Sequence, residues 1–499
     1  MNLRQQAARG IVWSTAQTWG ARAISFLVLL VLARLLVPED FGLVALASIF
    51  IAFAEIFLDQ GFSAAIVQYP EIERAHLDTA FWTGMLISSL LMVCTVAASE
   101  PIAALFNEPQ LAPIVSWLSL SFPISALSSV QQSILKRQLS FKSLAVRSFV
   151  ATLVGGVVAI SMAFLGFGVW SLVAKLLVSS LVGVVVLWRV SNWRPGFSYS
   201  KKHFKDLFTF GINIVGSNLV DFFSRRSDDF LIGYFLGTTA LGYYTLAYNI
   251  LLMMTDLITS VPTSVAFPAF SRLQGEPERM RSSFYEFTRL MNIIAFPAFL
   301  GMAVVASEVV LALYGPDWSP SIPVIQILMF IGILHSAFYF YGNVLKAAGK
   351  PFWRFRILLL TAIINVIGFA LAIRLGWGIV GVAAAYLIVS FLIFPLYFLT
   401  IRSLIQIEFR AYLRQCTAPL IGSLIMIIIV FGLKYILIDE LVYSFQLFIY
   451  VLVGGLTYLL VLHFIAPSHI QQMLDLASLA FRNLNLRNPE ESEIQTTKL

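Results

Sequence analysis

Charged side chains are scarce in this chain of 499 residues. Only 12% of the residues are Asp, Glu, Lys or Arg, whereas 59% are hydrophobic. An average soluble domain carries about 25% charged residues, which cover its surface. A soluble globular fold is therefore excluded, and the composition predicts an integral membrane protein.

The chain also has few of the residues that covalent or metal chemistry requires. Its two cysteines, Cys94 and Cys416, lie in or beside apolar runs, so neither a disulfide framework nor a thiolate metal site is expected. There is no phosphate-binding loop motif, no zinc-ligand spacing and no pairing of a nucleophile with a base. We therefore expect no catalytic residues, no metal and no cofactor, and the chain is not predicted to be an enzyme.

Long apolar runs are what the sequence has in abundance. A bilayer core about 30 Å thick needs about 20 helical residues to cross it, and helices satisfy their own backbone hydrogen bonds there. Fourteen runs of this size predict an all-α membrane protein with about fourteen transmembrane helices. The predicted spans are 11–34, 41–60, 80–99, 111–134, 146–165, 167–188, 208–236, 241–264, 290–313, 322–345, 356–375, 379–401, 416–437 and 442–465.

Basic residues alternate from one connection to the next along these spans. With the N-terminus inside, 26 of the 33 Lys and Arg residues fall in cytoplasmic segments or at the cytoplasmic ends of spans, and only Arg34, Arg374 and Lys434 lie at external ends. The positive-inside rule then places both termini in the cytoplasm. The same distribution explains the net charge of +7 without a nucleic-acid partner, and it predicts contacts with anionic membrane lipids.

Three local patterns recur about 200 to 210 residues apart and in the same order. The pairs are 41–47 with 241–247, 135–136 with 345–346, and 166–168 with 376–378. They predict two six-helix lobes, residues 1–200 and 201–410, followed by spans 13 and 14 (411–466) and a cytoplasmic tail (467–499). Because six is even, the lobes enter the membrane in the same direction. Such a parallel repeat around a central cavity is typical of transporters.

Three motifs then resemble a known family. The opening Arg9-Gly10 through Trp13, the turn Leu32 to Gly42 with its Pro-Glu-Asp-Phe-Gly sequence, and Asp59 to Phe62 at the end of span 2 resemble polysaccharide exporters of the Wzx type. These exporters belong to the multidrug/oligosaccharidyl-lipid/polysaccharide (MOP) flippase superfamily.

The resemblance implies a flippase that uses alternating access. It would carry undecaprenyl-diphosphate-linked oligosaccharide from the cytoplasmic to the periplasmic or outer face of a bacterial inner membrane, for exopolysaccharide, capsule or lipopolysaccharide O-antigen synthesis. A polysaccharide polymerase and the export machinery would be further partners. Alternatives are another transporter of the superfamily, either a peptidoglycan-precursor flippase or a cation-coupled drug exporter, an enzyme acting on the same lipid, and an export scaffold. The short external connections argue against the enzyme.

Basic residues inside the spans are candidates for binding substrate. A charge at mid-membrane costs about 3 kcal/mol on insertion scales, so each one needs a partner, water or a function. Arg22 would either face the lipid diphosphate or pair with Glu55 or Asp59. Arg225 and Arg226 would either bind the substrate or pair within the helix, Arg225 with Asp228 or Asp229. The remaining cavity candidates are Lys175, Asn213 and Asn218.

Acidic residues at similar depths are candidates for coupling transport to an ion. Glu55 and Asp256 lie 201 residues apart, close to the repeat offset. A carboxylate at this depth can bind a proton or a sodium ion, or it can form a salt bridge instead. The full set of candidates is Glu55, Asp59, Asp228, Asp229 and Asp256.

Overall fold

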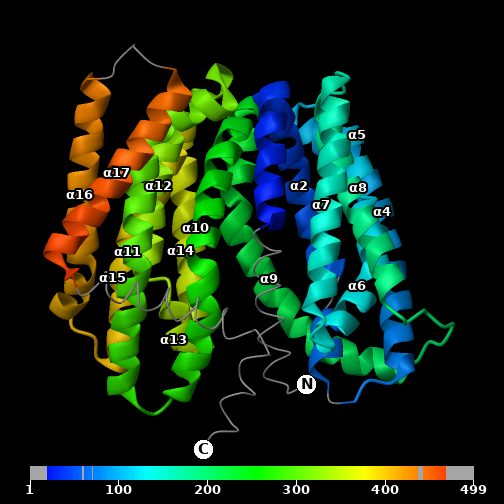
Figure 1. The fold of residues 1–499 in the computed structure, drawn as a ribbon. Coiled ribbons are helices and arrows are strands. Elements are labelled where there is room, and N and C mark those ends of the chain that lie inside the picture. The colour runs from blue at the N-terminus through cyan, green and yellow to red at the C-terminus, as the bar shows by residue number, and fades with distance from the viewer. Residues whose placement is uncertain (1–19, 59–60, 70, 437–441, 468–499) are drawn as a thin grey trace, which may run out of the picture. The chain divides into compact units, whose positions relative to one another are not determined.

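The computed structural model describes residues 20–58, 61–69, 71–436 and 442–467, and within these ranges the chain is helical with no strand (Figure 1). Side chains at 207–215, 217, 261, 264, 265 and 351 lie outside the description. The first described helix covers residues 20–35. The others are α2 (Pro38–Leu58), α3 (Phe62–Gln68), α4 (Arg74–Phe106), α5 (Leu111–Leu118), α6 (Ser121–Arg137), α7 (Phe141–Phe164), α8 (Val169–Val190), α9 (Lys201–Leu236), α10 (Thr238–Arg272), α11 (Pro277–Val309), η1 (Val310–Tyr314), η2 (Pro316–Trp318), α12 (Ser321–Ala337), α13 (Tyr341–Ala347), α14 (Pro351–Arg374), α15 (Gly378–Ile405), α16 (Phe409–Ile436) and α17 (Tyr443–Ile465).

Eleven helical segments in the described residues are long and apolar enough to span a membrane. They correspond to eleven of the predicted spans. The other three predicted spans correspond to the helix at 20–35 and to the long helices α9 and α10. The all-helical membrane fold is thus confirmed, while the number fourteen stays a prediction.

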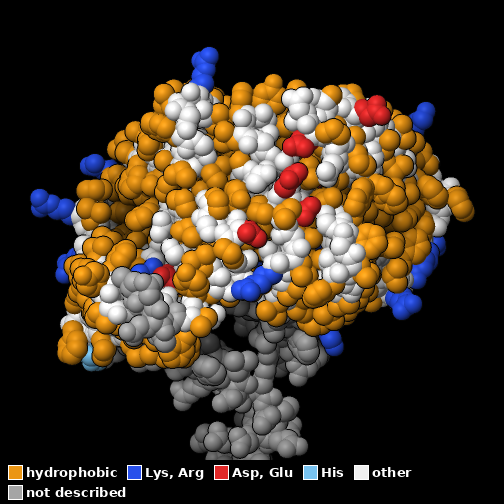
Figure 2. All heavy atoms as spheres, turned by 90° about the horizontal axis from the view of Figure 1, so that it is seen from above, with side chains coloured by type: hydrophobic (Ala, Val, Ile, Leu, Met, Phe, Trp, Pro, Cys, Tyr) orange, Lys and Arg blue, Asp and Glu red, His pale blue; other side chains and the backbone are white. Residues whose placement is uncertain are grey.

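Apolar side chains face outward along these helices. Leu86, Phe164 and Ile428 are each about 70% exposed, and Figure 2 shows hydrophobic side chains over much of the face seen from above. Exposed apolar surface of this extent marks a membrane contact. The protein is a multi-pass membrane protein.

The chain divides into two compact units. The first comprises residues 1–248, 313–324 and 358–389, and the second comprises 249–312, 325–357 and 390–499. This division follows contacts within the folded chain. The predicted lobes, residues 1–200 and 201–410, instead reflect a repeat in the sequence. The boundary between the lobes therefore stays a prediction.

At one end of the first unit, segments predicted to be external meet one another. The Trp318 indole N–H donates to the Ala33 carbonyl (2.8 Å), and the Thr238 hydroxyl donates to the Glu108 carboxylate (2.9 Å). The Arg34 Nε–H donates to the Leu313 carbonyl (2.9 Å). The connection after α4 therefore contacts the start of α10, and the connection after α11 contacts the helix that precedes α2.

Two glycines of the repeat make reciprocal contacts at this same end. A methyl group added to Gly42 of α2 would overlap the carbonyl oxygen of Thr238, and one added to Gly242 of α10 would overlap that of Pro38. Only glycine lets helix backbones approach this closely. Thr238 is Pro38 shifted by 200 residues, as Gly242 is Gly42 shifted by 200. Reciprocal contacts of this kind are what a two-fold axis between repeats produces.

At the other end of the first unit, segments predicted to be cytoplasmic meet. Asp78 near the start of α4 accepts hydrogen bonds from the Gly196 backbone N–H (3.0 Å) and the Ser198 hydroxyl (2.7 Å). Arg137 at the end of α6 donates to the Ile66 carbonyl of α3 (2.9 Å). The connection between α8 and α9 is thereby attached to α4.

In the second unit, α16 and α17 pack against α11. The Tyr458 hydroxyl donates to the Ile293 carbonyl (2.7 Å), and Lys434 forms an ion pair with Glu308 (2.8 Å). The predicted spans 13 and 14 therefore pack within this unit.

Candidate functional site

A cavity of about 330 Å³ in the first unit lies between α2 and α9. One face of each helix lines this cavity, because the lining residues recur three or four positions apart. Four of its lining residues were predicted from the sequence: Glu55, Asn218, Arg225 and Arg226. The other lining residues are Ala52, Ile56, Asp221 and Phe222.

Each arginine of the cavity has a carboxylate partner on α9. Arg225 Nε lies 3.3 Å from Asp221 Oδ2, and Arg226 Nη1 lies 3.0 Å from Asp229 Oδ2. The predicted pairing of Arg225 with Asp228 or Asp229 is wrong. Arg225 is 64% exposed, whereas Asp228 and Asp229 face the buried side of the helix. Arg225 therefore pairs with Asp221, which lies one helical turn earlier.

Asp228 and Asp229 belong to a buried network behind the cavity. Asp228 is 5% exposed and accepts hydrogen bonds from the Tyr244 hydroxyl (2.9 Å) and from the Asp229 backbone N–H (3.0 Å). Tyr244 is fully buried on α10. Buried carboxylates require such donors, because an unsatisfied charge is costly to desolvate.

Tyr244 is a functional candidate that the sequence reading missed. Within the repeat it stands at the position of Val44. A buried phenol in place of a valine is a departure from the repeat, and this departure was the available signal.

Aromatic side chains adjoin the charged part of the cavity. The ring of Phe53 on α2 lies 5.5 Å from that of Phe222 and 6.5 Å from that of Phe223, both on α9. The site therefore offers apolar ring faces next to ionised groups, an arrangement that suits an amphipathic ligand.

Other predicted site residues lie elsewhere. Arg22 is half-buried on the helix at 20–35, and Lys175 is half-buried on α8. Neither is among the described residues that line the cavity. Asp256 is exposed and belongs to the second unit. The Asn213 side chain and Asp59 lie outside the described residues.

The cavity can bind a ligand that carries both phosphate and hydroxyl groups. Guanidinium groups bind phosphate oxygens through paired, charge-assisted hydrogen bonds. Carboxylates such as Glu55 and Asp221 accept hydrogen bonds from hydroxyls. Because Arg225 and Asp221 are both substantially exposed, a ligand phosphate can replace the carboxylate at little cost.

Comparison with known proteins identifies relatives of this chain. Residues 31–323 match the family model described as "Polysaccharide biosynthesis protein". The chain is 28% identical to the teichuronic acid biosynthesis protein TuaB of Bacillus subtilis, over 87% of this chain and 90% of TuaB. It is 26% identical to the lipopolysaccharide biosynthesis protein WzxC of Escherichia coli, over 88% and 90%. The solved structure of the lipid II flippase MurJ, in an inward closed conformation, shares the fold with a TM-score of 0.73 at 18% identity, over 92% of this chain and 100% of MurJ.

Proposed function

Because this chain belongs to the polysaccharide biosynthesis protein family, we propose that it flips an undecaprenyl-diphosphate-linked oligosaccharide from the cytoplasmic to the outer face of a bacterial inner membrane. Membership of the family establishes the general role of the protein. The protein is a membrane transporter of the flippase type in the MOP superfamily and serves polysaccharide biosynthesis, and it is not an enzyme. The lipid carrier, the direction and the mechanism are the proposal.

The observation that carries the proposal is the charged cavity between α2 and α9. Two arginines, an exposed carboxylate and aromatic rings meet there on helices that the sequence predicts to span the membrane. A lipid-linked oligosaccharide has the matching parts, a diphosphate and sugar hydroxyls joined to an apolar chain. Arg225 would exchange Asp221 for a diphosphate oxygen, while Arg226 would stay anchored by the buried Asp229.

The buried network supplies a candidate site for a coupling ion. Asp228, Asp229 and Tyr244 place two carboxylates and a hydroxyl close together, and Arg226 neutralises one of the carboxylates. Protonation of Asp228 or sodium binding there would change how firmly α9 and α10 are joined. Glu55 in the cavity is a second candidate for the same role.

The reciprocal contacts at the predicted external end support alternating access. Pro38 to Gly42 of α2 and Thr238 to Gly242 of α10 close against each other. In the proposed cycle these helix ends separate when the substrate leaves on the outer side. The distribution of basic residues supports the proposal that both termini lie in the cytoplasm.

A deletion strain complemented with variants tests the function. We expect deletion to abolish the surface polysaccharide and to accumulate lipid-linked repeat units on the cytoplasmic leaflet, and the wild-type gene to reverse both. If polysaccharide stays normal while sensitivity to cationic drugs rises, the drug-exporter alternative is correct. If peptidoglycan precursors accumulate instead, the precursor-flippase alternative is correct.

A further inference from the structure

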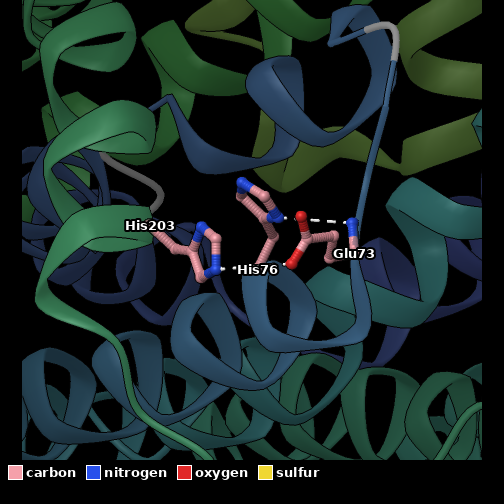
Figure 3. Close-up of side chains that lie close together, drawn as sticks. All are labelled: Glu73, His76 and His203. Carbon is pink, nitrogen blue, oxygen red and sulfur yellow. Dashed lines mark hydrogen bonds and ion pairs between the residues drawn. The ribbon is translucent and has the colours of Figure 1, made fainter.

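Two histidines and a glutamate meet near the predicted cytoplasmic end of the first unit, and none of them lines the cavity between α2 and α9. Glu73 precedes α4, His76 lies in the first turn of α4, and His203 lies in the first turn of α9. One ligand atom from each side chain lies within 4.8 Å of the other two. Figure 3 shows both imidazole rings beside the Glu73 carboxylate, with Nε2 of His203 at 3.7 Å from Oε2.

The surrounding structure holds these side chains in place. The Glu73 carboxylate accepts from the His76 backbone N–H, and the Glu73 N–H donates to Nδ1 of His76 (3.2 Å), which together cap α4. The Ser200 hydroxyl oxygen accepts from the His203 N–H and caps α9, while the Ser200 N–H donates to Thr79 (3.1 Å). The start of α9 is therefore positioned by Ser200 and Thr79, which lie outside the cluster, whereas the cap of α4 is made by Glu73 and His76 themselves.

The two imidazole rings lie so close together that one bound cation suits them better than a proton on each ring. Their centroids are 3.8 Å apart, so protonating both rings would bring two positive charges together. Nδ1 of His203 is buried and has no hydrogen-bond partner among the described residues. The lone pair of Nδ1 of His76 accepts the Glu73 backbone N–H, so a metal bound at that nitrogen would replace this hydrogen bond. In His203 the nitrogen that faces the Glu73 carboxylate is Nε2.

The donor set selects the kind of ion. Two imidazoles and one carboxylate are ligands that Zn²⁺ takes in proteins, with bonds of about 2.0–2.2 Å and a fourth position left for water or another group. Calcium and magnesium prefer oxygen ligands alone. Tetrahedral coordination at these bond lengths places ligand atoms about 3.4 Å apart, so atoms that now lie within 4.8 Å of one another must approach by at most about 1.4 Å. The Glu73 side chain is 72% exposed, so little packing opposes this movement.

Two charged side chains of α9 lie close enough to act on His76. Asp206 follows His203 by one helical turn, and its charge acts on His76, as does that of Lys202. Each helix start therefore brings one imidazole and one carboxylate at i,i+3 spacing, which places them on the same face.

We propose that Glu73, His76 and His203 bind a divalent transition metal ion of the Zn²⁺ type, which ties the start of α4 to the start of α9. The α9 helix also carries the cavity residues 218–226. Occupancy of the metal site therefore fixes the cytoplasmic end of the helix on which the cavity is built. The metal site stands independently of the transported substrate.

Zinc titration of the purified full-length protein in lipid nanodiscs, after removal of metal with a chelator, tests this site. Calorimetry should show one Zn²⁺ bound per chain. Glu73→Gln and His203→Gln should each weaken binding at least about tenfold, because removal of even an outer partner of a metal ligand typically has that effect. Glutamine at 73 keeps an oxygen acceptor for the α4 cap, so folding should be preserved.

His463→Gln, which changes an exposed histidine on α17, is the matched control and should bind zinc like the wild type. Cobalt should give the visible absorption of tetrahedral Co²⁺ in the wild type and lose it in His203→Gln. Absence of zinc binding by well-folded wild-type protein would overturn the proposal. Equal zinc affinity in the wild type and His203→Gln would also overturn it, because binding would then be adventitious.

Discussion

Arg225 and Arg226 are neighbours in sequence but serve different parts of the site. Arg225 is largely exposed and pairs with the half-exposed Asp221. Arg226 pairs with Asp229, whose side chain is only 8% exposed. A surface ion pair contributes about 0–1 kcal/mol, whereas stranding a buried charged group is much more costly. The two arginines should therefore respond differently to truncation.

We expect Arg225→Ala to abolish export while leaving thermal stability nearly unchanged, because the residue contacts substrate in the proposed mechanism. Arg226→Ala should lower the free energy of unfolding, on the order of 1–3 kcal/mol, because it strands the Asp229 carboxylate. Surface polysaccharide and thermal unfolding in detergent, measured on the same variants, separate the two effects.

The double variant Arg226→Ala/Asp229→Asn is the control. It should regain most of the stability lost in Arg226→Ala, because no buried charge remains unpaired. A destabilised Arg225→Ala protein, or a double variant no more stable than Arg226→Ala, would contradict these assigned roles.

At the scale of helices, the contact between α2 and α10 depends on two glycines. Gly42 and Gly242 meet the backbone carbonyls of Thr238 and Pro38, so the helix starts contact each other without intervening side chains. Any side chain there must push the helices apart. The contact also joins the two copies of the repeated sequence. In the proposed transport cycle, these are the helix ends that separate when the substrate leaves.

Gly42→Ala should lower the thermal unfolding temperature and export together, because overpacking of this kind typically costs about 1–3 kcal/mol. Gly84→Ala is the matched control, since Gly84 lies within α4 and a methyl group added there meets nothing within 4 Å. That control should be neutral or slightly stabilising, because alanine favours helix more than glycine does. Unfolding temperatures that are the same for both variants would show that the close approach is unimportant.

At the scale of the whole molecule, the connections of the first unit sort into two groups. Segments predicted to be external contact one another, as Glu108 contacts Thr238, and segments predicted to be cytoplasmic do likewise, as Asp78 contacts Ser198. The grouping agrees with the alternation of basic residues. Which group faces the cytoplasm follows from the positive-inside rule alone.

Single cysteines test the orientation. Cysteine at Gln110 or Asp317 should react in intact cells with a thiol reagent that cannot cross the membrane, whereas cysteine at Lys202 should react only after the cells are opened. All three positions are exposed, so differences in reaction report the side of the membrane. Labelling of Lys202→Cys in intact cells, with Asp317→Cys unlabelled, would reverse the topology.

The amino-acid sequence alone determined the membrane class and the family resemblance, and it predicted the approximate positions of the helices and the repeat. These properties depend on hydropathy, the distribution of charge and local motifs, each of which is readable along the chain. It also singled out Glu55, Asn218, Arg225 and Arg226, because a charged or polar group within an apolar run is conspicuous without any knowledge of contacts.

Only the tertiary structure decided which of these groups meet. Asp229 rather than Asp228 pairs with Arg226, and Tyr244 joins Asp228 from another helix, because the direction of each side chain is set by helix packing. His203 lies beside Glu73 and His76 although nearly 130 residues separate them, and no ligand spacing along the chain predicts such a cluster. Contacts between distant segments depend on how helices pack, and apolar periodicity in a membrane leaves that packing undetermined, since lipid is as apolar as the protein interior.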